Sequence, residues 1–121
     1  MKRTLYMVGI ILAFTALAAF ARDAGEQDRI EFLIYSVENL KGALFIRNGA
    51  PHDGKEAADH LRMKLQKAGS RVKTADDFIR LCASASSMTG RPYMIRLPDG
   101  TVMRSEEFLR ERLKRYRPAV R

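Results

Sequence analysis

Glu56 and His60 come closest to catalytic chemistry in this sequence. They are four positions apart, so a helix would place them on one face, and Lys64 would continue the same line. A carboxylate one turn from an imidazole can orient the ring as a general base. Ordinary charge pairing on a helix surface produces the same spacing, and the structural interpretation is the more common one.

Segment 84–90 contains the hydroxyl groups that could supply a nucleophile or hold an anion. Ser86 with His60 as base would suit a small hydrolase or transferase, but the serines of this segment lie in neither a G-x-S-x-G nor an S-x-x-K motif. Hydroxyl and basic groups together can instead bind an anionic or polar ligand. The ligand-binding candidates are Arg47, Asn48, His60, Lys64, Arg71, Lys73, Ser86 and Ser87.

The sequence predicts neither a metal site nor a cofactor. His52 and His60 are the only histidines, and no ligand spacing typical of zinc surrounds them. No Walker or Rossmann motif is present, which argues against a nucleotide.

Residues 1–21 have the features of a secretory signal peptide. Lys2 and Arg3 precede an uncharged apolar stretch, and Ala19-Phe20-Ala21 supplies the small residues of a cleavage site. An uncleaved anchor helix is the alternative, since 4–21 is at the short limit for spanning a bilayer. We expect cleavage after Ala21, export to the periplasm or the cell exterior, and no stable membrane span afterwards.

Residues 22–121 are expected to form a single domain. Removing 1–21 lowers the net charge from +8 to +6. Residues 104–121, which end in the basic tail 117–121, contribute +4 of this charge. Such a tail can attract anionic lipids or acidic polymers, whereas export argues against a nucleic acid partner. Cys82 is the only cysteine and lies in an apolar helical stretch, so a buried thiol is expected.

Local patterns predict four helices. Asp28 with Glu31, Asp53 with Glu56, and Thr74 with Asp77 resemble capping pairs, and Ser105 would cap the last helix before Pro118. Gly42 and Gly69 would end the first two helices.

Short β-prone segments at 43–47, 93–97 and 101–104 predict a small sheet. Asn48-Gly49 and Pro98-Asp99-Gly100 are turn sequences. The fold class is therefore α+β, with about four helices packed on a two- or three-stranded antiparallel sheet.

The chain also resembles a bacterial family of small secreted proteins, domain of unknown function 5329, over most of 30–115. The segments that carry the resemblance are 34–38, 45–49, 56–64, 69–75, 78–79 and 85–93. It implies no reaction, cofactor or catalytic residue. It does imply a shared polar pocket or surface, since its characteristic positions include Arg47, Asn48, Glu56, His60, Lys64, Arg71, Lys73 and Ser86.

These observations favour a non-catalytic envelope module that binds an anionic or polar partner. The first alternative is an enzyme that uses Glu56–His60 with a serine of 84–87. The second is a subunit that binds a partner through the basic last helix.

Overall fold

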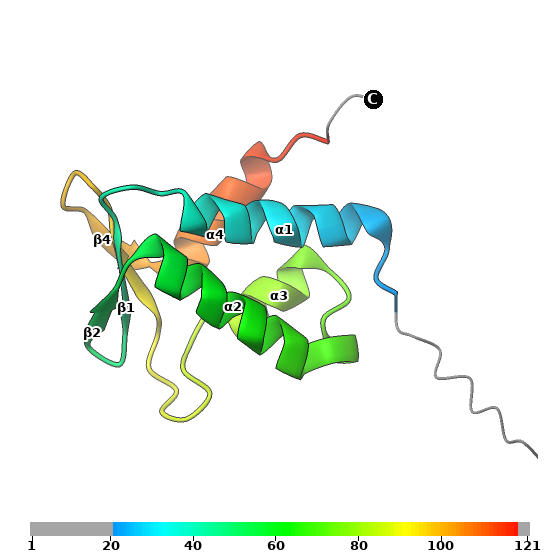
Figure 1. Cartoon of the computed structure of the whole chain (residues 1–121), viewed down its shortest axis with the longest axis horizontal. Helices are drawn as coiled ribbons and strands as arrows, with labels where there is room; N and C mark the ends of the chain where they lie inside the picture. Colours follow the sequence, from blue (N-terminus) through cyan, green and yellow to red (C-terminus); the bar gives the residue numbers. More distant parts are fainter. Residues whose placement is uncertain (1–20, 119–121) are drawn as a thin grey trace, which may run out of the picture.

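The computed structural model describes residues 21–118, and its architecture confirms the α+β class. Four α-helices and a 3₁₀ turn accompany one antiparallel sheet of four strands in the order β2-β1-β3-β4. The sheet forms one end of the molecule, and α1 and α2 run away from it (Figure 1). The sheet has one strand more than the sequence predicted.

Helix α1 (Ala24–Glu38) begins earlier than expected. The Asp23 carboxylate accepts hydrogen bonds from the backbone N–H groups of Gly25 and Glu26, so Asp23 is the N-cap and the predicted start at Asp28 is wrong. The apolar stripe was predicted correctly, and its members are all buried: Ile30, Leu33, Ile34 and Val37.

Strands β1 (Leu44–Arg47) and β2 (Ala50–His52) form a hairpin. Asn48 and Gly49 both have positive φ, 50° and 79°, as the predicted tight turn requires. The sequence analysis missed β2 because it has only three residues and contains Pro51, which can occupy an edge strand.

Helix α2 (Gly54–Ala68) begins at the predicted cap, where the Asp53 carboxylate accepts from the Glu56 N–H. Gly54 packs directly against the end of α1: a Cβ added there would lie 2.5 Å from the Val37 carbonyl oxygen. Only glycine permits this approach of the two backbones. The 3₁₀ turn η1 (Gly69–Arg71) follows the helix.

Helix α3 (Ala75–Cys82) begins with the predicted capping box. The Thr74 hydroxyl accepts from the Asp77 N–H, and the Asp77 carboxylate accepts from the Thr74 N–H. The Cys82 thiol is buried and free, as expected, and burial raises its pKa.

Strands β3 (Met94–Arg96) and β4 (Val102–Arg104) lie where they were predicted, and β4 leads directly into α4 (Ser105–Arg115). The expectation that Ser105 caps α4 is wrong. Ser105 is the first helical residue, and its N–H donates to the Tyr93 carbonyl, which continues the β3–β4 pairing to the start of the helix.

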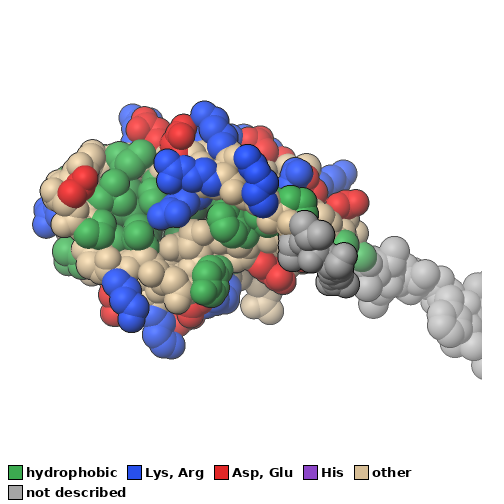
Figure 2. All heavy atoms as spheres, turned by 90° about the horizontal axis from the view of Figure 1, so that it is seen from above, with side chains coloured by type: hydrophobic (Ala, Val, Ile, Leu, Met, Phe, Trp, Pro, Cys, Tyr) green, Lys and Arg blue, Asp and Glu red, His purple; other side chains and the backbone are tan. Residues whose placement is uncertain are grey.

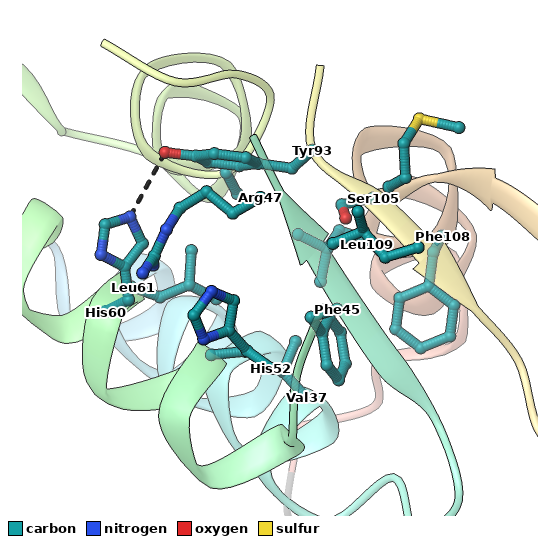
Figure 3. Close-up of a pocket in the computed structure, with 14 residues that line it drawn as sticks. Val37, Phe45, Arg47, His52, His60, Leu61, Tyr93, Ser105, Phe108 and Leu109 are labelled. Carbon is teal, nitrogen blue, oxygen red and sulfur yellow. Dashed lines mark hydrogen bonds between the residues drawn. The ribbon is translucent and has the colours of Figure 1, made fainter. Parts of the chain in front are cut away.

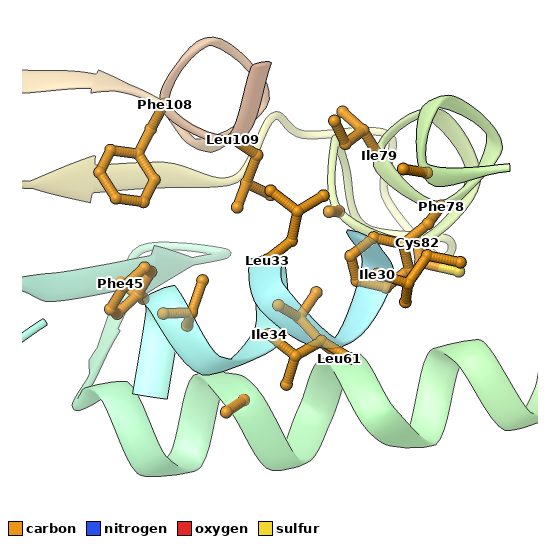
Figure 4. Packing of buried hydrophobic residues seen from close by; sticks show 14 of the residues in the cluster. Ile30, Leu33, Ile34, Phe45, Leu61, Phe78, Ile79, Cys82, Phe108 and Leu109 are labelled. Carbon is orange, nitrogen blue, oxygen red and sulfur yellow. The ribbon is translucent and has the colours of Figure 1, made fainter. Parts of the chain in front are cut away.

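The apolar core lies between the helices and one face of the sheet (Figure 4). Phe78 and Ile79 of α3 meet Ile30 and Leu33 of α1, and none of the four is exposed to solvent. Ile95 brings the centre of the sheet into the same cluster.

Within residues 21–118, no helix has both the length and the apolar character needed to cross a bilayer. Residues 1–20 of the predicted signal peptide fall outside this range, as do residues 119–121 at the end of the basic tail, and nothing in the described range tests cleavage after Ala21. Those assignments remain predictions.

Candidate functional site

A partly open cleft separates α2 from the face of β1 and β3 that is turned toward the helices; we call it the α2 cleft (Figure 3). Its cavity of about 40 Å³ has room for a few water-sized groups. Its apolar lining comes mainly from Val37, Phe45, Ala57, Leu61, Phe108 and Leu109, and its polar lining from Arg47, His52, His60, Tyr93 and Ser105.

The Tyr93 hydroxyl links the sheet side of the cleft to α2. It lies 3.3 Å from His60 Nε2, as Figure 3 shows. It also lies 3.0 Å from the Lys64 ammonium. An ammonium can only donate, so the hydroxyl accepts from Lys64 and has its own proton available for the imidazole nitrogen. Lys64 also donates to the Ala85 carbonyl at 3.0 Å. Helix spacing places His60 and Lys64 one turn apart on the same face of α2.

Burial and neighbouring positive charge lower the pKa of His60 from 6.5 to about 4. Desolvation is the largest cause, followed by Arg47 and then Lys64. The imidazole is therefore neutral near pH 7, which suits an Nε2 that accepts from Tyr93. The positive charge around the cleft belongs to the two cations rather than to the histidine.

Arg47 extends from the end of β1 toward His60 and lies among the polar groups of the cleft (Figure 3). Its side chain is half-buried. Throughout residues 21–118, no hydrogen bond or ion pair engages its guanidinium. A half-buried guanidinium without such a partner is available to an anion entering from solvent.

The hydroxyl of Ser86 organises the segment 84–93. It accepts from the N–H groups of Met88 and Thr89 and from the Asn48 amide, each at 3.3 Å. The Asn48 carbonyl oxygen in turn accepts from the Thr89 hydroxyl at 2.7 Å. The segment is thus attached to the β1–β2 turn, and Ser86 is buried with its oxygen used as an acceptor.

Glu56 does not orient His60. Its carboxylate lies 2.9 Å from Nδ1 of His52, and the Glu56 side chain is 61% exposed. Because His52 is the last residue of β2, this pair joins the edge strand to the first turn of α2. Glu56 and His60 therefore do not form the predicted general-base pair, because the Glu56 carboxylate makes a surface contact with His52.

The predicted ligand-binding residues fall into separate groups. Arg47, His60 and Lys64 come together at the α2 cleft, and Asn48 with Ser86 anchors the adjoining segment. Arg71 and Lys73 follow the opposite end of α2, where both side chains are exposed and the Arg71 Nε donates to the Ala68 carbonyl.

Ser87 is exposed in the segment 84–93. Tyr93, whose hydroxyl is the centre of the polar contacts, is absent from the candidates that the sequence predicted. The signal that could have found it is the alternation of the strand, which puts Tyr93 on the same face as Ile95.

Within the described range, no three His, Cys, Asp or Glu side chains gather in a way that could hold a metal ion. The groups around the Tyr93 hydroxyl are the Lys64 ammonium, the neutral His60 imidazole and the nearby Arg47 guanidinium, while His52 and Ser105 complete the polar lining of the cleft. Together they offer hydrogen-bond donors and positive charge beside an apolar cavity.

The model of a family described as "Family of unknown function (DUF5329)" matches residues 24–117. A relative from Salmonella typhimurium (strain LT2), described as "Uncharacterized protein YfeK", is 39% identical over 85 residues. The matched stretch covers 69% of this chain and 71% of the relative. No solved structure matches the chain.

Proposed function

The chain belongs to the DUF5329 family of unknown function, and we propose that it is a non-catalytic binding module whose α2 cleft holds a small anionic ligand with a short apolar part. The anionic group would lie against Arg47 and Lys64, and the apolar part would enter the cavity beneath them. The predicted export makes an envelope compartment, periplasmic or extracellular, the place where such a ligand would be met.

The observation that carries the proposal is the Arg47 guanidinium, which is half-buried beside a cavity without an internal hydrogen bond or ion pair. A charge in that position loses part of its hydration in the folded state, and no carboxylate of the described chain compensates for the loss. An anionic ligand would supply the missing partner and could bind the guanidinium with two parallel hydrogen bonds.

Lys64 and Tyr93 support the same interpretation. The ammonium is 4.9 Å from the centre of the Tyr93 ring and is fixed by two hydrogen bonds, so its charge is already positioned. A ligand that binds to prepositioned groups does not have to order flexible side chains. The apolar lining gives a short hydrocarbon group a surface to cover.

The hydrolase or transferase alternative receives less support. It required a base oriented by Glu56 and a nucleophilic serine within reach of His60. Glu56 contacts His52 instead, and the Ser86 oxygen already accepts three hydrogen bonds, two from its own segment and one from Asn48.

The alternative that uses the basic last helix also receives less support. Arg110 pairs with Asp76 and Glu106, and Lys114 pairs with Glu111. Part of the positive charge on α4 is therefore compensated within the molecule, whereas the charge of Arg47 is not.

A ligand titration followed by two-dimensional NMR tests the proposal. The probes are a series of linear carboxylates from acetate to hexanoate, inorganic phosphate, and butylamine as a cationic control. We expect saturable shifts at Arg47, His60 and Tyr93, with affinity that rises along the carboxylate series until the cavity is filled. Butylamine should produce none.

The variant Arg47→Gln is matched with the control variant Arg71→Gln. Each substitution removes one guanidinium, but Arg47 is half-buried at the cleft and Arg71 is exposed at the opposite end of α2. Arg47→Gln should weaken the best carboxylate or phosphate about tenfold, the loss of one charge-assisted contact. Arg71→Gln should leave its affinity unchanged. Equal affinities for the two variants, or shifts that never saturate with any anion, would refute the proposal.

A further inference from the structure

The face of the sheet turned away from the helices has an unusual composition. Phe45 and Ile95 point inward and are buried, so strand alternation assigns their neighbours to the outward face. An antiparallel sheet that faces water normally places polar residues at such positions. Here the outward positions include five apolar residues: Leu44, Ile46, Pro51, Met94 and Val102.

The strand register arranges these residues in two rows. Leu44 pairs with Arg96, which pairs with Val102. The second row contains Pro51, Ile46 and Met94 and ends at Arg104. Leu44 is 37% exposed and Val102 is 51% exposed, so the face is open to solvent. We call these seven positions the outer sheet face.

Hydrophobic side chains also gather at the sheet end of the molecule in the space-filling view (Figure 2). A continuous apolar surface next to charged groups marks an interaction site in soluble proteins. Methionine and arginine are both enriched in protein interfaces.

Arg96 and Arg104 determine what kind of partner fits. Both are exposed, and within residues 21–118 neither guanidinium has an ion pair or a side-chain hydrogen bond. The outward positions of the sheet contain no Asp or Glu. The face therefore complements an apolar surface that carries carboxylates.

A second copy of the chain would bring Arg96 and Arg104 against the same two residues, and the net charge of +8 adds to the repulsion. A lipid surface fits less well, since interfacial membrane binding favours aromatic residues and none occupies an outward position. Two exposed guanidinium groups beside apolar residues are better suited to paired carboxylates on a protein.

We propose that the outer sheet face is the docking surface for an acidic protein partner, whose contact patch combines apolar residues with at least two carboxylates that pair with Arg96 and Arg104. Ile46 and Met94 also border the α2 cleft, whereas the other five positions, including both arginines, do not line it. The proposal stands independently of ligand binding in the cleft.

Site-specific photocrosslinking of the full chain in its native host tests the proposal. A benzophenone amino acid replaces Val102 on the outer sheet face or, as a control, Tyr35, which is 64% exposed on α1. We expect a crosslink from position 102 to one protein, and mass spectrometry should locate it in a segment that contains apolar residues and at least two Asp or Glu. Position 35 should not give this product.

Charge reversal then tests the role of the arginines. The pair Arg96→Glu and Arg104→Glu should reduce the yield of the product about tenfold. The matched pair Lys67→Glu and Arg115→Glu, which changes the net charge equally at exposed positions on α2 and α4, should leave it unchanged. Circular dichroism of both double variants checks that they remain folded.

Four outcomes of the crosslinking experiments would overturn the proposal. They are a crosslink to lipid, a crosslink to a second copy of this chain, no product specific to position 102, and a product that is insensitive to the reversal at Arg96 and Arg104. Binding to vesicles of phosphatidylglycerol and phosphatidylethanolamine that is lost in the Arg96/Arg104 variant would assign the face to a membrane instead.

Discussion

Two regions contribute to the interior of this small domain: the core between α1 and α3, and the α2 cleft. They differ in whether their polar and charged groups find partners within the described chain. In the core, Phe78, Ile30 and Ile79 are fully removed from solvent and bring no polar side-chain group with them. At the cleft, Tyr93 and Lys64 have polar atoms that are paired with each other, and Arg47 brings a charge that no residue of 21–118 pairs. The core is complete without a ligand, whereas the cleft has a charge that lacks a partner among the described residues.

The largest effect should come from the core. Phe78→Ala removes a fully buried ring from α3, and we expect the free energy of unfolding to fall by about 3–5 kcal/mol, as measured by urea denaturation. Met88→Ala is the control, because Met88 is a large apolar residue that is 95% exposed. Similar losses in the two variants would contradict the assignment of the core.

The second effect should come from the paired part of the cleft. Lys64→Met keeps most of the side-chain length but removes the donor to the Tyr93 hydroxyl and the Ala85 carbonyl, so we expect a loss of about 1–2 kcal/mol. Lys67→Met, three positions further along α2 and exposed, should have no measurable effect. If both variants keep the wild-type stability, the contacts of Lys64 do not hold the segment 84–93 in place.

A smaller effect should appear as a dependence on pH. The folded state holds the pKa of His60 near 4, below its ordinary 6.5, so between these values the unfolded chain takes up a proton that the folded chain resists. Stability should therefore decrease as the pH falls from about 6.5 to about 4. Partial solvation of the ring limits the expected contribution to about 1 kcal/mol.

The His60→Gln variant should lack this contribution. Urea denaturation gives the free energy of unfolding of both proteins at pH 7 and at pH 4.5. The contribution of His60 is the change between the two pH values in the wild type minus the same change in the variant. This subtraction removes the contribution of the carboxylates, which both proteins share. Parallel pH dependence in the two proteins would show that His60 titrates normally in the folded state.

The smallest effect on stability should come from Arg47. Because its guanidinium makes no hydrogen bond or ion pair in the described chain, Arg47→Gln should change the free energy of unfolding by less than about 0.5 kcal/mol. The same variant should lose ligand affinity, as described above. A large loss of stability would mean that Arg47 has a structural role. It would contradict the view that Arg47, unlike the core residues, is available to a ligand.

The parts of the fold that depend on nearby residues could be predicted from the sequence. The Thr74–Asp77 capping box, the Asp53 cap and the Asn48-Gly49 turn are each decided within a few positions, and all three are confirmed. Asp23 and β2 were missed for different reasons. The cap at Asp23 competed with an equally good pattern at Asp28, and β2 exists through its pairing with β1.

The candidate site could be predicted only in part. Arg47, His60 and Lys64 were named from their types, but the residue that joins them to the sheet is Tyr93, 29 positions beyond Lys64. Arg71 was grouped with them because sequence proximity does not reveal which end of α2 meets the sheet. Nor could the sequence reveal that Arg47 has no hydrogen-bond or ion-pair partner among residues 21–118, since that depends on every side chain around it.

Gly54 has a consequence for protein engineering. At this position α1 and α2 meet through backbone atoms, with no side chain between them that could adjust. The distance between α1 and α2 at this end of the cleft is thus set by Gly54 and does not depend on Arg47, His60 or Lys64. The recognition chemistry of the cleft can therefore be varied by substitution at those three residues while Gly54 continues to hold its dimensions.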